Sequence, residues 1–402
     1  MLGSMSAFAK ILRIANAAWD RLKVQLLTPH ARRVLEDRVP PASQQIPFAV
    51  YFADVPSSAY QLQQWLSPLE TLQASSGPVA LLVRHPVVAE QFAAQTALPI
   101  ILVDQFSRVE QFVGRHQVKV VFYVNNNQSN FTALRLTAPV HVHLSHGESE
   151  KTSMYSNQLK AYDYAFIAGE ASAERILNHV RNINPEHLVR IGRPQLAVPL
   201  TPATNGPQDA SRVTVLYAPT WEGDSPQMAY GSLVTHGEQL IERLAEDGRF
   251  RIVFRPHPKS GTNSPRYRAA LDGIRRTLST PAAKAAGHVV DSEPNAAHSI
   301  AGSDVVIADV SAMAMDALGM NRPLILCLPP VETSSELAAH VAVWRGAITP
   351  EATDTVAALA AGPVPDAQTR YRDFVFTTAD PAEAVGLFIT AAQHAAARAT
   401  CS

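Results

Sequence analysis

The sequence is poor in cysteine, in long apolar runs and in net charge, and each shortage disfavours a class of protein. Its 402 residues include two cysteines, too few for a disulfide framework or a cysteine-based zinc site. No apolar run is long enough to span a bilayer, and the first residues lack the pattern of a signal peptide. The formal net charge of -1 gives no overall field that would attract nucleic acid. We therefore expect a cytoplasmic protein with no nucleic-acid partner.

Two common nucleotide-binding signatures are also missing. No Walker A sequence is present, and no GxGxxG fingerprint follows the first expected strand, which disfavours ATPases and dinucleotide-dependent enzymes. The acidic residues are not arranged in a spacing that demands a metal ion. The sequence thus assigns no metal ligand and predicts no resident cofactor.

What the sequence does contain is alternation between apolar runs and helical patterns. Hydrophobic residues make up 47% and charged residues 17%, enough for a sizeable core. Runs such as PFAVYFADV, PVALLVR and VKVVFYVN, and later RVTVLYA, RFRIVFR and RPLILCL, are typical of buried parallel strands. Between the two series, residues 193–211 hold four prolines and little periodicity. The pattern predicts two doubly wound α/β domains facing a cleft, and open sheets of this kind bind ligands beyond the carboxyl ends of their strands.

The expected organisation has five parts. They are an N-terminal helical segment (1–40), a first Rossmann-like domain (41–195), a linker (196–211), a second Rossmann-like domain (212–378) and a C-terminal helix (379–402). Within the first part, residues 6–38 form an amphipathic pattern with seven lysine or arginine residues against three acidic ones. Such a helix could lie on an anionic membrane, or it could pack on its own domain or on a second copy in a homo-oligomer.

The first candidate catalytic group is His146, which follows the alternating strand of residues 140–144. Histidine titrates near neutral pH and could accept a proton from an attacking hydroxyl. Gly147 permits a tight turn and close approach of a ligand, and Glu148 or Glu150 could orient the imidazole. The alternative is a structural histidine in a turn.

The second candidate cluster follows another strand, in the sequence FRPHPK. Arg255, His257 and Lys259 are spaced by prolines that fix the local backbone. Three donors at the end of a strand suit a ligand that carries phosphate. A solvated basic loop is the alternative.

A third cluster lies in DVVIADVSAMAMDALG. Asp309 and Ser311 could cap the helix that follows, and the helix start could hold a phosphate that Ser311 also contacts. Asp316, further along the helix, could reach a ribose hydroxyl. Ordinary helix capping is the alternative.

Two weaker signals complete the set. Thr220 and Trp221 end the first strand of the second domain and could line the cleft, although the aromatic ring could simply pack. The run that includes Asn126 ends a strand of the first domain and offers amide groups.

Taken in order, these clusters resemble the CDP-glycerol glycerophosphotransferase family, the polymerases and primases of teichoic acid and related capsule polymers. The shared pattern is His-Gly after a strand, then Tyr-x-Pro-Thr-Trp, Arg-x-His-Pro, and Asp-x-Ser-x(4)-Asp near Arg-Pro. In this chain the motifs are His146-Gly147, Tyr217–Trp221, Arg255–Pro258, and Asp309 to Asp316 followed by Arg322-Pro323. The chain departs from the usual pattern at Glu148-Ser149, where Thr-Pro is common, at Glu222 in place of arginine, and at Ala312 in place of serine.

The resemblance implies a GT-B-type fold and transfer of a polyol phosphate, glycerol phosphate above all, from a CDP-activated donor to an acceptor hydroxyl of a polymer or lipid-linked chain. CMP would be released, and the enzyme would attach peripherally to the inner face of the cell membrane. In this hypothesis His146 and His257 are catalytic and the phosphates of the donor are bound on the second domain. Donor binding is assigned to Arg255, Asp309, Ser311, Asp316, Thr220 and Trp221, and the acceptor side to Gly147, Glu148, Glu150, Lys151 and Asn126.

Two other functions stay open on the sequence alone. A GT-B glycosyltransferase that uses a nucleotide sugar could employ the same donors around its leaving group. A non-catalytic binding component of a polymer assembly is the second alternative, which the paired histidines disfavour.

Overall fold

The computed structural model describes residues 22, 24–151, 154–197, 211–223, 229–291, 293, 295–328 and 335–399. A helix covers residues 24–34, so the second half of the expected N-terminal helix is present. Residues 6–21 and 23 of that helix lie outside the described residues, as do residues 198–210 of the expected linker.

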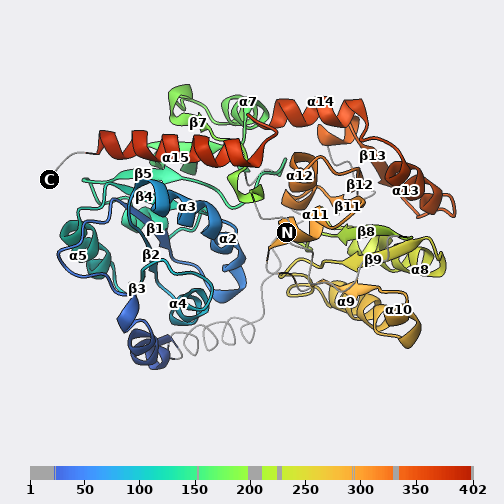
Figure 1. Cartoon of the computed structure of the whole chain (residues 1–402), viewed down its shortest axis with the longest axis horizontal. Helices are drawn as coiled ribbons and strands as arrows, with labels where there is room; N and C mark the ends of the chain where they lie inside the picture. The colour runs from blue at the N-terminus through green and yellow to red at the C-terminus, as the bar shows by residue number, and fades with distance from the viewer. Residues whose placement is uncertain are drawn as a thin grey trace, which may run out of the picture. The chain divides into compact units, whose positions relative to one another are not determined.

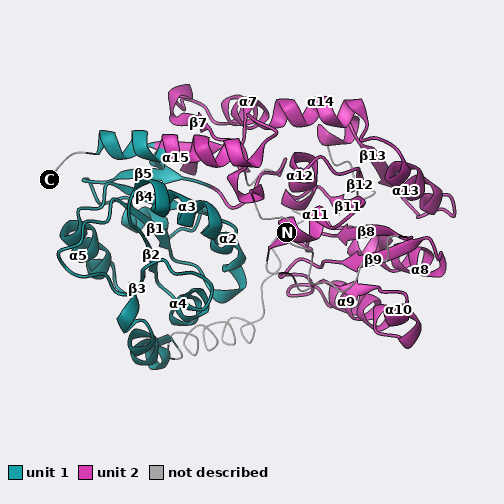
Figure 2. Ribbon diagram, viewed as in Figure 1, with its two compact units in different colours: residues 1–144, 161–163, 392–402 teal, residues 145–160, 164–391 magenta. Residues whose placement is uncertain are grey.

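The chain forms two compact units, drawn in separate colours in Figure 2. Unit 1 comprises Met1–Leu144, Ala161–Asp163 and Ala392–Ser402, and unit 2 comprises Ser145–Lys160 and Tyr164–Ala391. The division matters for the site because the segment that follows Leu144, with His146 in it, belongs to unit 2.

Unit 1 is built on parallel strands whose order is β3-β2-β1-β4-β5. Every residue of β1 and β2 is buried, which explains why these strands appear in the sequence as continuous apolar runs. The elements in chain order are η1 (Glu36–Arg38), β1 (Phe48–Phe52), η2 (Pro56–Ser58), α2 (Tyr60–Gln63), α3 (Leu66–Ser76), β2 (Val79–Val83), α4 (Pro86–Ala93), β3 (Ile100–Leu102), α5 (Phe106–His116), β4 (Val120–Tyr123), α6 (Asn130–Ala133) and β5 (Val140–His143) (Figure 1).

Unit 2 begins with two strands that pair in parallel, β6 and β7, and continues into a six-stranded parallel sheet of order β10-β9-β8-β11-β12-β13. Its elements up to the centre of the sheet are η4 (Asn157–Ala161), β6 (Tyr164–Ile167), α7 (Glu170–His179), η5 (Pro185–His187), β7 (Leu188–Arg190), η6 (Pro194–Leu196), β8 (Val213–Ala218), the π-helix η8 (Leu233–Gly237), α8 (Glu238–Glu246), β9 (Phe250–Phe254), α9 (Pro265–Leu278), α10 (Pro281–Ala285), β10 (Val289–Val290) and α11 (Ala296–Ala301). The rest are β11 (Val305–Asp309), α12 (Ala312–Gly319), β12 (Leu324–Leu328), η9 (Leu337–Ala339), β13 (Ala342–Arg345), α13 (Ala352–Ala361), α14 (Asp366–Val375) and α15 (Pro381–Arg398), whose residues from Ala392 on belong to unit 1.

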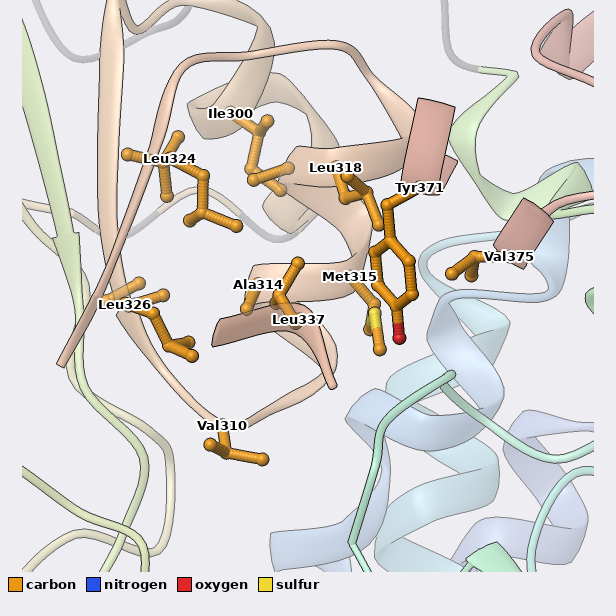
Figure 3. Packing of buried hydrophobic residues seen from close by; sticks show 14 of the residues in the cluster. Ile300, Val310, Ala314, Met315, Leu318, Leu324, Leu326, Leu337, Tyr371 and Val375 are labelled. Atoms are coloured by element: carbon orange, nitrogen blue, oxygen red, sulfur yellow. The ribbon is translucent and has the colours of Figure 1, made fainter. Parts of the chain in front are cut away.

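Successive side chains of each strand point to opposite faces of the six-stranded sheet, and a hydrophobic cluster covers each face. Along β8, Val215 and Tyr217 join a cluster with α8 and α9, whereas Leu216 and Ala218 join a second cluster on the other face. Figure 3 shows this second cluster, in which Met315 and Leu318 of α12 lie near Tyr371 of α14. The packing fixes α12 against the sheet, and its first turn therefore has a defined place beyond β11.

Candidate functional site

The His146 loop rests on the first turn of α12. Ser145, at φ 57, turns the chain, and its hydroxyl donates to the carbonyl oxygen of Gly147 at 3.1 Å. A Cβ atom on Gly147 would lie 2.8 Å from the Cβ of Ala312, the first residue of α12. Only glycine fits at position 147, and a small residue is needed opposite it. The contact explains the alanine at 312 and brings the histidine of the loop to the start of the helix.

Two glutamates of the loop anchor it within unit 2. Glu148 is 5% exposed and accepts hydrogen bonds from Ser172 Oγ at 2.7 Å and Arg175 Nη1 at 3.1 Å. Burial raises the pKa of Glu148, although Arg175 opposes the shift. Glu150 accepts from the backbone N–H of Leu337 at 2.8 Å and from the hydroxyl of Tyr371 at 2.9 Å. Through these partners Glu148 and Glu150 hold the loop in place. The sequence had predicted that one of the two would orient the His146 imidazole.

Lys151 extends from the same loop to the end of β8. Its Nζ donates to Thr220 Oγ1 at 3.1 Å and lies 5.5 Å from the ring centroid of Tyr230. Burial lowers the pKa of Lys151 to about 8, and the nearby carboxylate of Asp309 opposes the shift. The side chain expected on the acceptor side thus faces the residues expected to bind the donor.

Asp309 closes a loop instead of capping a helix. Its Oδ2 accepts from the backbone N–H groups of Thr220 at 2.7 Å and Ser232 at 3.0 Å, and its Oδ1 has no hydrogen-bond partner in the part of the chain that the structure describes. Burial raises the pKa of Asp309 to about 6, against the influence of these donors and of Lys151. Ser311 stands at the N-cap position of α12, but its hydroxyl donates to the carbonyl oxygen of Asp309 at 3.0 Å. The expected capping by the Ser311 side chain is therefore wrong.

Asp316 is engaged by an arginine within the protein. Arg193 donates from Nε to Asp316 Oδ1 at 2.8 Å and from Nη2 to Oδ2 at 3.3 Å. The two side chains are 7% and 6% exposed, so the pair is buried. Both carboxylate oxygens are occupied, and the structure gives Asp316 a structural partner where a ribose hydroxyl was expected.

Arg255 is likewise tied to a buried acid. Its Nη1 donates to Asp291 Oδ2 at 2.7 Å, and also to the carbonyl oxygen of Glu293 at 2.9 Å. The Asp291 side chain is fully buried. Arg255 therefore supports the loop beyond β9, and a direct role toward the donor phosphates remains a proposal.

His257 is held in one tautomer beside Trp221. The two rings are stacked, with centroids 6.0 Å apart and planes 16° from parallel. The backbone N–H of Lys259 donates to His257 Nδ1 at 3.1 Å, so the proton of the neutral ring is on Nε2. Burial lowers the pKa of His257 to about 3, with smaller contributions from Lys151, Lys259 and His146. At neutral pH His257 is an uncharged hydrogen-bond donor.

Glu222 is a residue whose role the sequence did not reveal. Its carboxylate accepts from the backbone N–H groups of Gly261, Asn263 and Ser264 at 3.0, 2.7 and 3.0 Å. Burial acts to raise its pKa, but these donors hold the pKa of Glu222 below the ordinary value of 4.5. The glutamate that replaces the usual arginine therefore shapes the loop after His257.

The remaining candidate, Asn126, belongs to unit 1, whereas the other candidates belong to unit 2. Its neighbour Asn125 is fixed by donating Nδ2 to Gln61 Oε1 at 2.7 Å and to Asp54 Oδ2 at 3.2 Å. Among the described residues, no group of three or more His, Cys, Asp or Glu is placed to hold a metal ion.

One family model matches more than half of the chain. A family model described as CDP-Glycerol:Poly(glycerophosphate) glycerophosphotransferase matches residues 105–336, a range that contains all four motifs. No curated protein sequence matches the chain.

Several solved structures share the fold. The wall teichoic acid polymerase TagF, soaked with CDPG, matches with a TM-score of 0.53 and 14% identity over 98% of this chain and 99% of that one. A putative UDP-N-acetylglucosamine 2-epimerase from Listeria monocytogenes matches with a TM-score of 0.57 and 13% identity over 86% and 96%. A glycosyltransferase from Rickettsia africae matches with a TM-score of 0.51 and 12% identity over 87% and 98%. The expected GT-B-type α/β class with two parallel sheets is confirmed.

Proposed function

Since this protein belongs to the CDP-glycerol:poly(glycerophosphate) glycerophosphotransferase family, we propose that unit 2 binds CDP-glycerol and transfers its glycerol phosphate to an acceptor hydroxyl. The acceptor oxygen forms a bond to the β-phosphorus as the bond from this phosphorus to the bridging oxygen breaks, and CMP leaves. The observation that carries the proposal is the contact of Gly147 with Ala312, because it supports a histidine and a helix start acting on the same phosphate.

The donor diphosphate is assigned to the start of α12 and to His257. A helix start offers unbonded N–H groups and a partial positive charge, both suited to an anion. Because Ser311 directs its hydroxyl at the Asp309 carbonyl, the backbone rather than this side chain supplies most of the binding. His257 donates through Nε2–H, which stabilises charge that develops on a phosphate oxygen as the bond breaks.

His146 is the proposed general base. It would accept the proton of the acceptor hydroxyl, a role in which a positioned side chain contributes about 10²–10⁴-fold. The neutral His257 nearby places no positive charge next to this base. Trp221, which is stacked on His257, presents its ring beside the phosphate site and could contact the donor.

We assign the acceptor to a glycerol phosphate polymer of the teichoic acid type, which fits both the family and the polymerase whose fold the chain shares. The proposal is tested by incubating the protein with a glycerol phosphate oligomer and, in turn, CDP-glycerol, CDP-ribitol and UDP-sugars, with identification of the released nucleotide. Release of CMP from CDP-glycerol, with a new phosphodiester on the oligomer, is expected. Release of UDP alone would support a glycosyltransferase, and CDP-glycerol binding without turnover would support a binding component.

Peripheral membrane attachment is a separate part of the proposal. No helix within the described ranges is long and apolar enough to cross a bilayer. The helix over residues 24–34 leaves Leu26 70% and Leu27 39% exposed, and Arg33 of the same helix is exposed too. Exposed leucines beside basic residues suit an anionic surface. Wild-type protein should float with anionic liposomes at low salt, and a Leu26→Glu, Leu27→Glu variant should not. Equal flotation of the two proteins would show that this helix does not attach the protein to the membrane.

A further inference from the structure

Lys151 is a partly buried cation that the described residues leave with hydrogen-bonding capacity. An ammonium group carries three N–H donors, and the structure gives Lys151 one hydrogen-bond acceptor among the described residues, Thr220 Oγ1. The ring of Tyr230 covers another side of the group at 5.5 Å. A partly buried ammonium group that has one protein acceptor among the described residues can donate its other N–H groups to a ligand that supplies acceptors.

The surroundings of this ammonium group are the parts of the site assigned to phosphate. Thr220, its acceptor, is itself held by Asp309 at the end of β11, two residues before Ser311 and the start of α12. Lys151 also lies near enough to His257 to help lower the pKa of that ring. Lys151, the neutral His257 and the start of α12 thus lie around one small region of unit 2.

We propose that Lys151 binds the diphosphate of the CDP donor directly and becomes fully protonated as the diphosphate arrives. The proposal rests on the proposed function, and it moves Lys151 from the acceptor side to the donor side of the site. The proton comes from solvent and goes to the Nζ of those molecules in which the amine is neutral.

The charges around Lys151 explain why its protonation would depend on the ligand. In the free protein burial lowers its pKa to about 8, and Asp309 only partly offsets this. His257 and Tyr230, which also face it, are both neutral at this pH and contribute no favourable charge. A diphosphate beside the amine would raise the pKa again, because an opposite charge favours the charged form. At pH 8 about half of the lysines would take up a proton on binding.

The test is calorimetric titration of the full-length protein with CDP at pH 8, in two buffers that differ in ionisation enthalpy. The heat difference between buffers gives the number of protons taken up. Wild type should take up about half a proton. Lys151→Met should weaken CDP binding about ten- to a hundredfold, the range for loss of a hydrogen bond to a charged group, and should lose the proton uptake. Lys160→Met, which removes an exposed lysine of η4, should match wild type in both respects.

Lys151→Arg separates charge from mere packing. Its permanent positive charge should keep CDP affinity within a few-fold of wild type while abolishing proton uptake, since arginine does not titrate at pH 8. Thermal unfolding shows whether each variant is folded. Should the methionine variant not fold, continued proton uptake by the arginine variant would overturn the proposal. If a folded Lys151→Met protein binds CDP with wild-type affinity, the role of Lys151 is refuted and the proposed function is unaffected. If the wild-type protein does not bind CDP, the proposed function itself is refuted.

Discussion

Removing the carboxylate of Asp316 should destabilise unit 2 and leave donor recognition largely intact. Asp316→Ala strands the guanidinium of Arg193 without its partner, in a position where the two side chains are 7% and 6% exposed. Breaking a buried ion pair in this way costs about 3–5 kcal/mol, because the remaining charge is uncompensated. For a domain of 150–250 residues each kcal/mol lowers the melting temperature by about 2–4 °C, so we expect a fall of roughly 6–20 °C.

The matched control is an exposed pair in the same unit. Arg190 and Glu170 approach to 2.7 Å, with side chains 39% and 49% exposed. Glu170→Ala should cost at most about 1 kcal/mol, since water and salt screen an exposed pair. A double variant, Arg193→Met with Asp316→Leu, should recover much of the stability lost by Asp316→Ala, because it removes both buried charges.

Differential scanning calorimetry and CDP titration together decide the matter. If Asp316 has a structural role, Asp316→Ala should melt at a much lower temperature than wild type. Its affinity for CDP should be nearly unchanged at a temperature where the variant is folded. An Asp316→Ala protein that melts within about 2 °C of wild type but binds CDP at least tenfold more weakly would contradict this reasoning. That outcome would instead support a contact from Asp316 to the ribose.

Three further variants test other parts of the site. His146→Ala should lower kcat by about 10²–10⁴-fold with CDP affinity unchanged, and wild-type turnover would refute the base assignment. Ser311→Ala should weaken CDP binding at most about fivefold, or about 1 kcal/mol, because the hydroxyl donates to the Asp309 carbonyl and the backbone holds the phosphate, and a loss of several orders of magnitude would reveal a chemical role for the hydroxyl. Glu222→Ala should speed amide hydrogen exchange at residues 261–264, and exchange at the wild-type rate would show that the carboxylate does not order this loop. Because the pKa of Glu222 is held below 4.5, its stabilising effect should be complete above that pH and lost as the pH falls through the folded value, so the alanine variant should show a weaker acid dependence of melting temperature.

The sequence was informative about the fold wherever burial was complete. Strands such as β1, β2 and β12 are buried at every residue, and each appears as a continuous apolar run. There was no clear signal for β7 and β13, which are only three and four residues long and in which every residue except Leu188 is at least partly exposed. A short, half-exposed strand is defined by the neighbour it pairs with, and that neighbour cannot be read from local composition.

The same limit applies to the site. The motifs indicated His146, His257 and the helix after Asp309 as candidates. The proton chemistry of histidine and the partial positive charge of a helix start do not depend on the fold. The partners could not be inferred, since Arg193 and Asp316 are 123 residues apart and Asp309 and Ser232 are 77 apart. Glu222 was noted as a departure from the family pattern, but its three backbone donors depend on the shape of a loop about forty residues further on.

The single oxygen of Asp309 that receives both Thr220 N–H and Ser232 N–H has a consequence for redesign. The hydrogen bonds from Thr220 and Ser232 to one carboxylate oxygen tie together the two ends of the segment between these residues. Trp221 and Tyr230 are the first residues with side chains from either end of that segment. A change that shifts one end of the segment pulls on the other through a fully buried atom. Substitutions at either end of this segment should therefore be designed and selected together.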